Sequence, residues 1–387
     1  MIIRDAVHGS IETTDLEERI IDSAQFQRLR FVRQLSTAHL VYPSAAHSRF
    51  EHSLGTMHLT GMAARQLELE DEEVGLLRLA GLLHDIGHSA FSHLGDEVLV
   101  EHGRPGHEKR GIDLVKNEPL GAVIESAGFS LKELVTRLEG KGTGALITQN
   151  LGTDRLDYLL RDSHHTGVGY SSVDYERLLH TLVLSDGAVR VHEKGLVAAE
   201  SLLVSRQFMF ATVYHHPVAM ISSAMLARAL QQGLEGKIIS PEELEQGTDL
   251  EVLAKLRDAG IDLAKRIWER RLYKKAVMLR VQQAPAAVRE FLNTQDCQAK
   301  LAEHLESIGI ATNSFVICPP PKAKSVREVE VVLRDGTVHR LEELSPLLRA
   351  LDQPSGYRSL IVACEPSMVE KTAKAVNNCL TSIGRVS

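Results

Sequence analysis

The sequence is poor in aromatic residues and in cysteine. Its 387 residues include one Trp, seven Tyr, nine Phe and four Cys. The cysteines lie in the last quarter of the chain and none forms a CxxC pair, which argues against a cysteine-based zinc site and a disulfide framework. We interpret them as reduced, mostly buried thiols of a cytoplasmic protein. They are Cys297, Cys318, Cys364 and Cys379.

Long apolar runs and an excess of basic charge are also missing. No apolar stretch approaches the roughly 18–20 residues that a membrane span needs. The first residues, MIIRDAVHG, carry charge where a signal peptide would be apolar. The formal net charge is −7, with 44 basic and 51 acidic residues, which argues against broad binding to nucleic acid or membranes. A local basic pocket for a small anion remains compatible with this balance.

The overall composition is that of a folded globular protein. Hydrophobic residues make up 43% of the chain and charged residues 25%, as in ordinary globular proteins. At about 100–200 residues per domain, the length predicts two domains and allows a large core.

Helical periodicity dominates up to about residue 285. A buried helix is expected from Asp71 through VGLLRLAGLLHDIG, because this segment is apolar on nearly all sides. The prolines of 318–324 exclude a helix, and VREVEVVLRD and SLIVAC favour strands after them. We predict a mainly α fold, with an all-α domain at 1–285 and a small α+β domain at 286–387. Further helices are expected at 153–162, 197–215, 220–234, 241–257, 262–280, 340–351 and 366–383.

Histidine is concentrated in the first part of the chain, where 16 of the 18 fall within residues 1–216. His84 and Asp85 are adjacent at the end of the buried apolar helix, where two polar groups are costly without partners. A metal ion is one such partner, and a His/Asp set suits Mn, Fe, Zn, Co or Ni, while carboxylates also admit Mg. Such a pair alone is a weak motif. With His52 upstream and Asp154 downstream, it forms a spaced H…HD…D set.

Five segments, three of which contain this set, occur in order, and the series closely resembles the HD-domain dNTP triphosphohydrolases. That group includes the vertebrate SAM-and-HD-domain enzyme and shorter prokaryotic relatives. The resemblance covers about residues 1–280 and implies an HD-domain helical core. The matching segments are DSAQFQRLRFVRQ (22–34), HSRFEHSLG (47–55), GLLHDIGHSAFSH (81–93), HE (107–108) and DRLDYLLRDSHH (154–165).

The resemblance implies a metal site and an adjoining catalytic set. In the family's chemistry one divalent ion polarises a phosphate oxygen or lowers the pKa of bound water. His93 would be the acid–base residue near the scissile phosphate, oriented by Asp96. His84 and His88 would share a helix face if the helix continued that far. The implied metal ligands are His52, His84, Asp85 and Asp154, and the implied catalytic set is His88, His93, Asp96, His107 and Glu108.

It also implies how a deoxynucleotide would be recognised. Three arginines would clamp the triphosphate. Tyr158 would pack against the C2′ edge of the sugar and exclude a 2′-hydroxyl. Asp154, Tyr158 and Asp162 are spaced to lie on one helix face. The implied substrate-binding residues are Gln34 and Asp162 for the 3′-hydroxyl, Leu35 and Tyr214 for the wall, Tyr158 for the sugar, and Arg49, Arg155 and Arg206 for the phosphates.

In the family a guanine nucleotide binds between subunits and drives assembly of an active tetramer. The resemblance therefore implies GTP or dGTP as an activator and a homotetramer or dimer of dimers. A second regulatory pocket fits less well, because Pro217 and His192 stand where some relatives carry basic residues. The matching guanine-site positions are Asp22, Gln27, Arg30, Arg270 and Lys274, the last two being i,i+4.

Three functions follow from these residues. The first is metal-dependent hydrolysis of a dNTP at the α-phosphorus, giving deoxynucleoside and inorganic triphosphate. The second is hydrolysis of another phosphoester, although the GVGY at 167–170 lacks the context of the cyclic-dinucleotide enzymes. The third is a nucleotide sensor or nucleic-acid binder with an idle site. Substituting His84 and Asp85 would separate an enzyme from a sensor.

Overall fold

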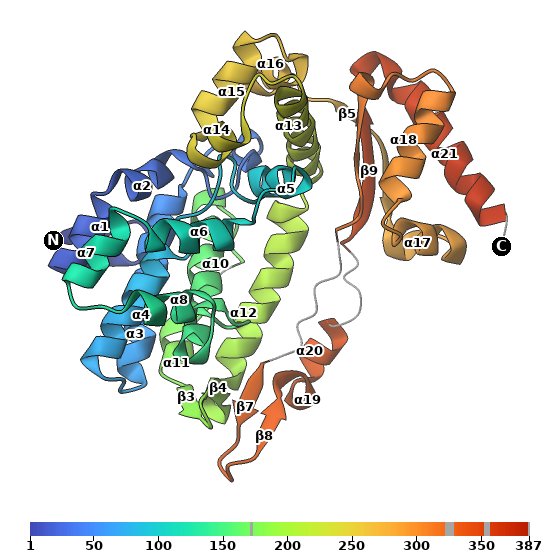
Figure 1. The fold of residues 1–387 in the computed structure, drawn as a ribbon. Coiled ribbons are helices and arrows are strands. Elements are labelled where there is room, and N and C mark those ends of the chain that lie inside the picture. Colours follow the sequence, from blue (N-terminus) through green and yellow to red (C-terminus); the bar gives the residue numbers. More distant parts are fainter. Residues whose placement is uncertain (171–172, 322–328, 352–356, 386–387) are drawn as a thin grey trace. The chain divides into compact units, whose positions relative to one another are not determined.

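The computed structural model describes residues 1–170, 173–321, 329–351 and 357–385, and most of them are helical (Figure 1). This confirms the mainly α fold with small sheets. The chain divides into two compact units. One comprises Met1–Met209, Ile239–Val252 and Val326–Asp352, and the other comprises Phe210–Ile238, Leu253–Ser325 and Gln353–Ser387. The expected boundary at residue 285 remains a prediction.

The first unit contains most of the helices. Its sheets are a hairpin of β1 and β2 and a four-stranded sheet in the order β3-β4-β7-β8. Its helices are α1 (Asp15–Ile21), α2 (Ala24–Gln27), α3 (Arg49–Gln66), α4 (Asp71–Leu83), α5 (His93–Glu101), α6 (His107–Lys116), α7 (Leu120–Ser126), α8 (Leu131–Leu138), α9 (Ala145–Thr148), α10 (Thr153–Thr166), α11 (Tyr175–Leu179), α12 (Leu196–Met209), α14 (Pro241–Gln246), α19 (Leu341–Leu344) and α20 (Pro346–Leu351). Its strands are β1 (Ile2–Asp5), β2 (Gly9–Glu12), β3 (Leu182–Ser185), β4 (Ala188–His192), β7 (Glu330–Val332) and β8 (Val338–Arg340).

Helices α3 and α4 pack side by side and form the scaffold of this unit (Figure 1). Helix α3 starts with a capping box between Ser48 and Glu51, which satisfies free N–H groups of its first turn. Three acidic residues stabilise the first turn of α4 through the helix dipole. The apolar faces of both helices share one core that includes Leu54, Met57 and Leu79. Helix α10 packs against α3 from another side.

The end of α4 differs from the expectation. The helix stops at Leu83 and His84 is its C-cap, so it does not run on to Gly87. His84 and His88 therefore do not share a helix face. The reason is local, because His88 N–H donates to the Asp85 carbonyl in a tight turn at 3.1 Å rather than continuing the helical ladder.

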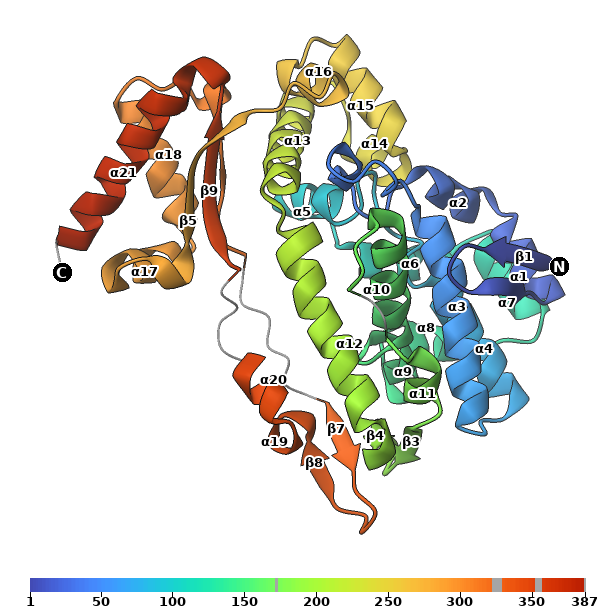
Figure 2. The same ribbon diagram turned by 180° about the vertical axis from the view of Figure 1, so that it is seen from behind.

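The second unit holds a three-stranded antiparallel sheet in the order β5-β9-β6. Figure 2 shows β5 beside β9. Helices α17, α18 and α21 pack on it around a core that includes Phe315, Val362 and Val376. Helix α15 (Asp249–Asp258) begins in the first unit and ends in this one. The three strands of this sheet are β5 (Lys274–Arg280), β6 (Phe315–Cys318) and β9 (Ser359–Cys364). The helical elements of the unit are a π-helical turn (Phe210–Tyr214), α13 (Pro217–Glu235), α16 (Asp262–Trp268), α17 (Ala286–Leu292), α18 (Cys297–Ser307) and α21 (Val369–Arg385).

The prediction of one helix over 262–280 is wrong in its second half. Helix α16 ends at Trp268, and Arg270 follows with φ of +54°. That left-handed residue closes the helix, since its N–H donates to the Ile267 carbonyl at 3.1 Å. From Lys274 the chain is strand β5, paired with the central strand β9. Pairing in the sheet overrides a sequence that is equally compatible with a helix.

The C-terminal elements agree with the expectation in part. SLIVAC is β9, and the helix predicted at 366–383 is α21, which begins at Val369. The helix predicted at 340–351 is divided into α19 and α20, because Ser345 between them is extended. Within the predicted strand VREVEVVLRD, Glu330–Val332 forms β7, while 326–328 lie outside the described residues. Strand β7 pairs in parallel with β4, so two segments far apart in sequence share one sheet.

One helical stretch is long and apolar enough to cross a membrane, although no membrane span was expected. Residues Glu193–Tyr214 are long enough for a span and have a mean hydropathy of 1.3. Part of the stretch is buried in the protein, and Leu202 and Leu203 belong to the core. A single such helix is weak evidence for a membrane protein, because core helices have the same composition.

Candidate active site

The four side chains predicted as metal ligands lie close together at one place, where α3, the end of α4 and the start of α10 meet. His52 comes from α3, His84 and Asp85 follow α4, and Asp154 lies in the first turn of α10. The Nε2 atom of His52 lies 3.1 Å from Oδ1 of Asp154 and 3.2 Å from Nε2 of His84. It also lies 3.5 Å from Oδ2 of Asp85. The structure therefore brings together the metal ligands expected from the sequence.

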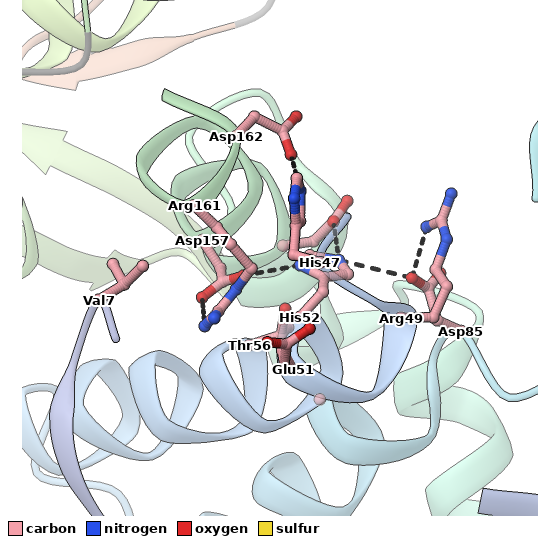
Figure 3. A network of polar contacts seen from close by, with 12 residues as sticks. Val7, His47, Arg49, Glu51, His52, Thr56, Asp85, Asp157, Arg161 and Asp162 are labelled. Atoms are coloured by element: carbon pink, nitrogen blue, oxygen red, sulfur yellow. Dashed lines mark hydrogen bonds and ion pairs between the residues drawn. The ribbon is translucent and has the colours of Figure 1, made fainter. Parts of the chain in front are cut away.

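The Nδ1 atoms of both histidines face away from this cluster. His84 Nδ1 lies 2.8 Å from the carbonyl oxygen of Gly81. His52 Nδ1 lies 2.7 Å from Oδ2 of Asp157 (Figure 3). With Nδ1 of each ring donating to these oxygens, both Nε2 atoms are left as acceptors toward the centre.

This donor set fits a divalent cation. Burial opposes charge on His52, but hydrogen bonds to Asp154 and Asp157 and the charge of Asp85 raise its pKa to about 10. The protein thus concentrates negative charge here, and a metal ion would replace the proton as its counter-charge. Two imidazole nitrogens with two carboxylates suit Mn, Fe, Co, Ni or Zn and are less typical of Mg.

A second cluster adjoins the first. The rings of His88 and His107 stack with centroids 3.8 Å apart, and the ring of His93 lies 4.8 Å from His88 and 5.4 Å from His107. His88 also links the two clusters, because its Nε2 lies 3.3 Å from Oδ1 of Asp85. Loss of solvation, followed by the charges of His88 and Arg49, lowers the pKa of His93 well below its usual value.

Asp96 organises this second cluster. Its Oδ2 accepts from Nδ1 of His88 at 2.6 Å and lies 3.1 Å from Nδ1 of His107. Its other oxygen pairs with Arg110. Burial disfavours the carboxylate, but the hydrogen bonds from His107 and His88 lower the pKa of Asp96 below its usual value. Asp96 therefore holds the two rings against which His93 packs, and among the described residues it orients His93 through these rings rather than through a direct hydrogen bond.

Glu108 stands apart from its expected partners. It lies in the first turn of α6 and is exposed. Within the described part of the chain it makes no hydrogen bond or ion pair with the histidine cluster. Its catalytic role remains a prediction.

The loop before His93 has a strained backbone, and a residue far away in the sequence hydrogen-bonds to it. Phe91 and Ser92 have φ values of +63° and +56°, which cost energy for residues other than glycine. The carboxylate of Asp249 accepts from the backbone N–H of Phe91 at 2.7 Å and of Arg33 at 3.1 Å. Asp249 is 2% exposed, and burial raises its pKa to about 6 despite these bonds. No motif or spacing indicated this contact, which joins segments far apart in the chain.

The three arginines expected at the phosphates occupy different positions. Arg49 is buried, and its Nη1 lies 2.6 Å from Oδ2 of Asp85 while its Nε donates to Ser92 Oγ at 2.9 Å. Arg155 donates to Oδ1 of Asn150 at 2.7 Å. Arg206 is buried on α12. Arg49 directly contacts a predicted metal ligand, and a clamp of three arginines remains a prediction.

The residues expected at the sugar lie along α10 and beside α3. Burial raises the pKa of Tyr158, and the charges of Arg155 and Arg206 oppose this rise. Oδ1 of Asp162 accepts from Nε2 of His47 at 2.7 Å, and the carbonyl of His47 accepts from the backbone N–H of Gln34 at 3.0 Å. His47 thus joins the two residues predicted to bind the 3′-hydroxyl, a link that the sequence did not reveal.

Two further sugar-site residues complete the expected set. Leu35 is partly buried directly after Gln34. Tyr214 lies in the π-helical turn of the second unit, where its ring packs edge-on against Phe210. Their contact with a substrate remains a prediction.

The regulatory positions form two groups. Arg30 Nε donates to Oε1 of Gln27 at 2.7 Å, and Asp22 is exposed at the end of α1. In the second unit, Arg270 and Lys274 line a pocket of about 290 Å³ that also includes Pro217. Arg270 and Lys274 therefore share a surface, although not through the helical spacing first expected.

A hub of buried charge behind His52 was missed by the sequence analysis. Asp157 and Arg161 lie on α10 and contact Asp5 and His8 of the N-terminal hairpin. The only signal was that Asp157 follows Asp154 by three residues and so lies near its helix face.

Two family models match this chain. The family model described as HD domain matches residues 49–160, and the model described as HD associated region matches residues 173–383. An uncharacterized protein of Methanocaldococcus jannaschii is 36% identical over 364 residues, which covers 92% of this chain and 77% of that protein.

Several relatives have a named activity. The deoxynucleoside triphosphate triphosphohydrolase SAMHD1 of Gallus gallus is 29% identical over 311 residues, which is 66% of this chain and 50% of that enzyme. The chain thus matches about half the length of that relative. A crystal structure of a hypothetical protein from Aquifex aeolicus matches 97% of this chain and 99% of its own, with a TM-score of 0.81 and 30% identity. With the HD domain and the HD associated region both matched, the chain belongs to the HD-domain phosphohydrolase family.

Proposed function

We propose that the protein hydrolyses deoxynucleoside triphosphates to deoxynucleoside and inorganic triphosphate. The observation that carries this proposal is the direct junction of a metal-ligand set with a histidine cluster. His88 contacts Asp85 of the first set and Asp96 of the second. Arg49 adds a buried cation at the same place. Relatives that are named deoxynucleoside triphosphate triphosphohydrolases support the choice of substrate.

A bound divalent ion, held by His52, His84, Asp85 and Asp154, would supply Lewis-acid activation of phosphate or water. Arg49 would meet the negative charge of the phosphates. His93 would donate a proton to the departing 5′-oxygen of the sugar. Its pKa is lowered in the free protein, so we expect the anionic triphosphate to raise it when bound.

Sugar selection would come from α10. Tyr158 lies one turn after Asp154 on the same helix. A ring packed against C2′ would leave no room for a 2′-hydroxyl, and Gln34 and Asp162 would bind the 3′-hydroxyl. His47 hydrogen-bonds to both Asp162 and the backbone of Gln34.

We also propose regulation by a guanine nucleotide in a homotetramer. Asp22, Gln27 and Arg30 would contribute one group of contacts to the nucleotide, and Arg270 and Lys274 would contribute another from the pocket that they line. Both sets offer cations or hydrogen-bonding groups to a nucleotide. GTP should raise both the molar mass in light scattering and the rate, and Arg30→Ala should weaken both effects. A monomer that is fully active without GTP would contradict this regulation.

The cytoplasm is the proposed location. Cys297, Cys318, Cys364 and Cys379 are all free, which fits a reducing compartment.

The test is a product assay with metal-replete protein. Each dNTP and each NTP would be incubated with Mn²⁺, with and without GTP, and the products separated by ion exchange. Deoxynucleoside with intact triphosphate supports the proposal. Turnover of another nucleotide phosphoester alone would favour the second function. Nucleotide binding without turnover of any substrate would favour the sensor.

A further inference from the structure

A chain of buried charges leads away from the metal-ligand set toward the N-terminus. Asp157 lies on α10 and is fully buried. Its Oδ2 accepts from Nδ1 of His52 at 2.7 Å, and its Oδ1 lies 2.6 Å from Nε2 of His8 (Figure 3 shows the contact with His52). His8 belongs to the turn between β1 and β2.

Arg161 completes the hub one turn further along α10. Its Nε and Nη2 each lie 2.9 Å from an oxygen of Asp157, in a bidentate pair. Its Nη1 lies 2.8 Å from Oδ2 of Asp5. The Asp157 carboxylate thus accepts four hydrogen bonds, which is the full capacity of the group. Its position and orientation are fixed from every side.

Helix α3 carries a glycine where this carboxylate approaches it. Gly55 lies three residues after His52, and a Cβ built there would be 1.8 Å from Oδ1 of Asp157 and 2.4 Å from Nη2 of Arg161. Any larger side chain would push the carboxylate and its guanidinium partner away. The glycine therefore lets α3 and α10 approach closely where the hub lies.

The N-terminal turn is itself braced toward the hub. Oδ1 of Asp5 accepts from the backbone N–H groups of Val7 at 2.9 Å and His8 at 2.8 Å. The other oxygen of Asp5 pairs with Arg161. Asp5 thus holds both the turn that presents His8 and the guanidinium that grips Asp157.

We propose that Asp157 is the positioning residue of the metal centre and that the N-terminal hairpin holds it in place. By accepting from Nδ1 of His52, Asp157 fixes the tautomer that turns Nε2 toward the metal and prevents rotation of the ring. His8 and the pair of Asp5 with Arg161 keep the carboxylate from turning. The hairpin is therefore part of the metal site, although it contributes no ligand. This proposal rests on the candidate metal site and not on the identity of the substrate.

The experiment measures binding of Mn²⁺ alone to the full-length protein, by calorimetry after the resident metal is removed. In Asp157→Asn an amide NH₂ replaces one carboxylate oxygen. This NH₂ group donates hydrogen bonds and would face the N–H donors of the neighbouring side chains. We expect Mn²⁺ to bind 10–100-fold more weakly, as is usual when the support of a metal-bound histidine is lost. The visible spectrum of the Co²⁺-substituted variant should also change. Because no substrate is used, failure of the proposed dNTP hydrolysis leaves this result interpretable.

Glu17→Gln is the matched control, because Glu17 is also a buried carboxylate and pairs with Arg78 at 2.6 Å and 2.7 Å. It should lower stability without changing Mn²⁺ affinity or the Co²⁺ spectrum. If Asp157→Asn does not fold, His8→Ala is the second variant. It removes the contact between His8 in the N-terminal turn and Asp157, and we expect a smaller loss of Mn²⁺ affinity. Wild-type affinity in a folded Asp157→Asn, or in His8→Ala where Asp157→Asn does not fold, would overturn the proposal. An equal loss of affinity in Glu17→Gln would overturn it too.

Discussion

The imidazole rings of His88 and His107 stack 3.8 Å apart with their planes 14° from parallel. Both rings turn Nδ1 toward the same oxygen of Asp96. One carboxylate therefore fixes two rings, and these form the wall against which His93 packs. A cluster built this way is organised before any substrate arrives, as expected for a site that stabilises developing charge.

Loss of a metal ligand should abolish hydrolysis. We expect Asp154→Ala to retain at least 10-fold less Mn²⁺ and to lose more than about 100-fold in rate, because the ligand set opens on one side. Metal content by mass spectrometry and turnover check this. Asp113→Ala is the control, since Asp113 is an exposed carboxylate paired with Lys109. Normal metal content and normal turnover in Asp154→Ala would refute the metal assignment.

Loss of His93 should separate catalysis from metal binding. We expect His93→Ala to lower kcat by about 10²–10⁴-fold, the usual contribution of a general acid. Its Mn²⁺ content should match the wild type, since His93 belongs to the second cluster and not to the ligand set. Steady-state kinetics and metal analysis test both parts. A variant with unchanged kcat would show that another group protonates the leaving oxygen.

Tyr158 should set the preference for deoxyribose. In Tyr158→Ala the space beside C2′ opens, so the ratio of rates on dATP and ATP should fall by at least about 10-fold. Tyr158→Phe keeps the ring and should keep the ratio. An alanine variant that discriminates as well as the wild type would remove the sugar-edge role from this residue.

Asp249 should make stability depend on pH in a predictable direction. Its pKa is about 6 in the folded protein against an ordinary value of 3.8. The folded state therefore binds more protons between these values, and stability falls as pH rises. Relative to Asp249→Asn, which does not titrate, the wild type should gain about 1 kcal/mol in free energy of unfolding from pH 7 to pH 5. Denaturant unfolding at both pH values measures this difference. A constant difference would refute the raised pKa.

The sequence predicted the parts of the site that depend on motif spacing. His52, His84, Asp85 and Asp154 could be found because together they form the spaced H…HD…D set, and the structure brings all four together. Helix α4 itself followed from its apolar character, although its end did not. His84 turns out of the helix because the chain forms a tight turn after Leu83.

Contacts between distant segments could not be predicted in this way. Asp157 meets His8 across 149 residues, and Asp249 meets Phe91 across 158. Neither pair has a spacing signal, because the fold alone brings the partners together. The strand at Lys274 was missed for a related reason, since its pairing with β9 decides its conformation.

The most direct test of the central claim is hydrolysis of a dNTP in H₂¹⁸O with mass spectrometry of both products. Attack of water at the α-phosphorus with release of the 5′-oxygen predicts one ¹⁸O in inorganic triphosphate and none in the deoxynucleoside. Deoxynucleoside monophosphate with pyrophosphate, or label in the deoxynucleoside, would contradict the proposed reaction.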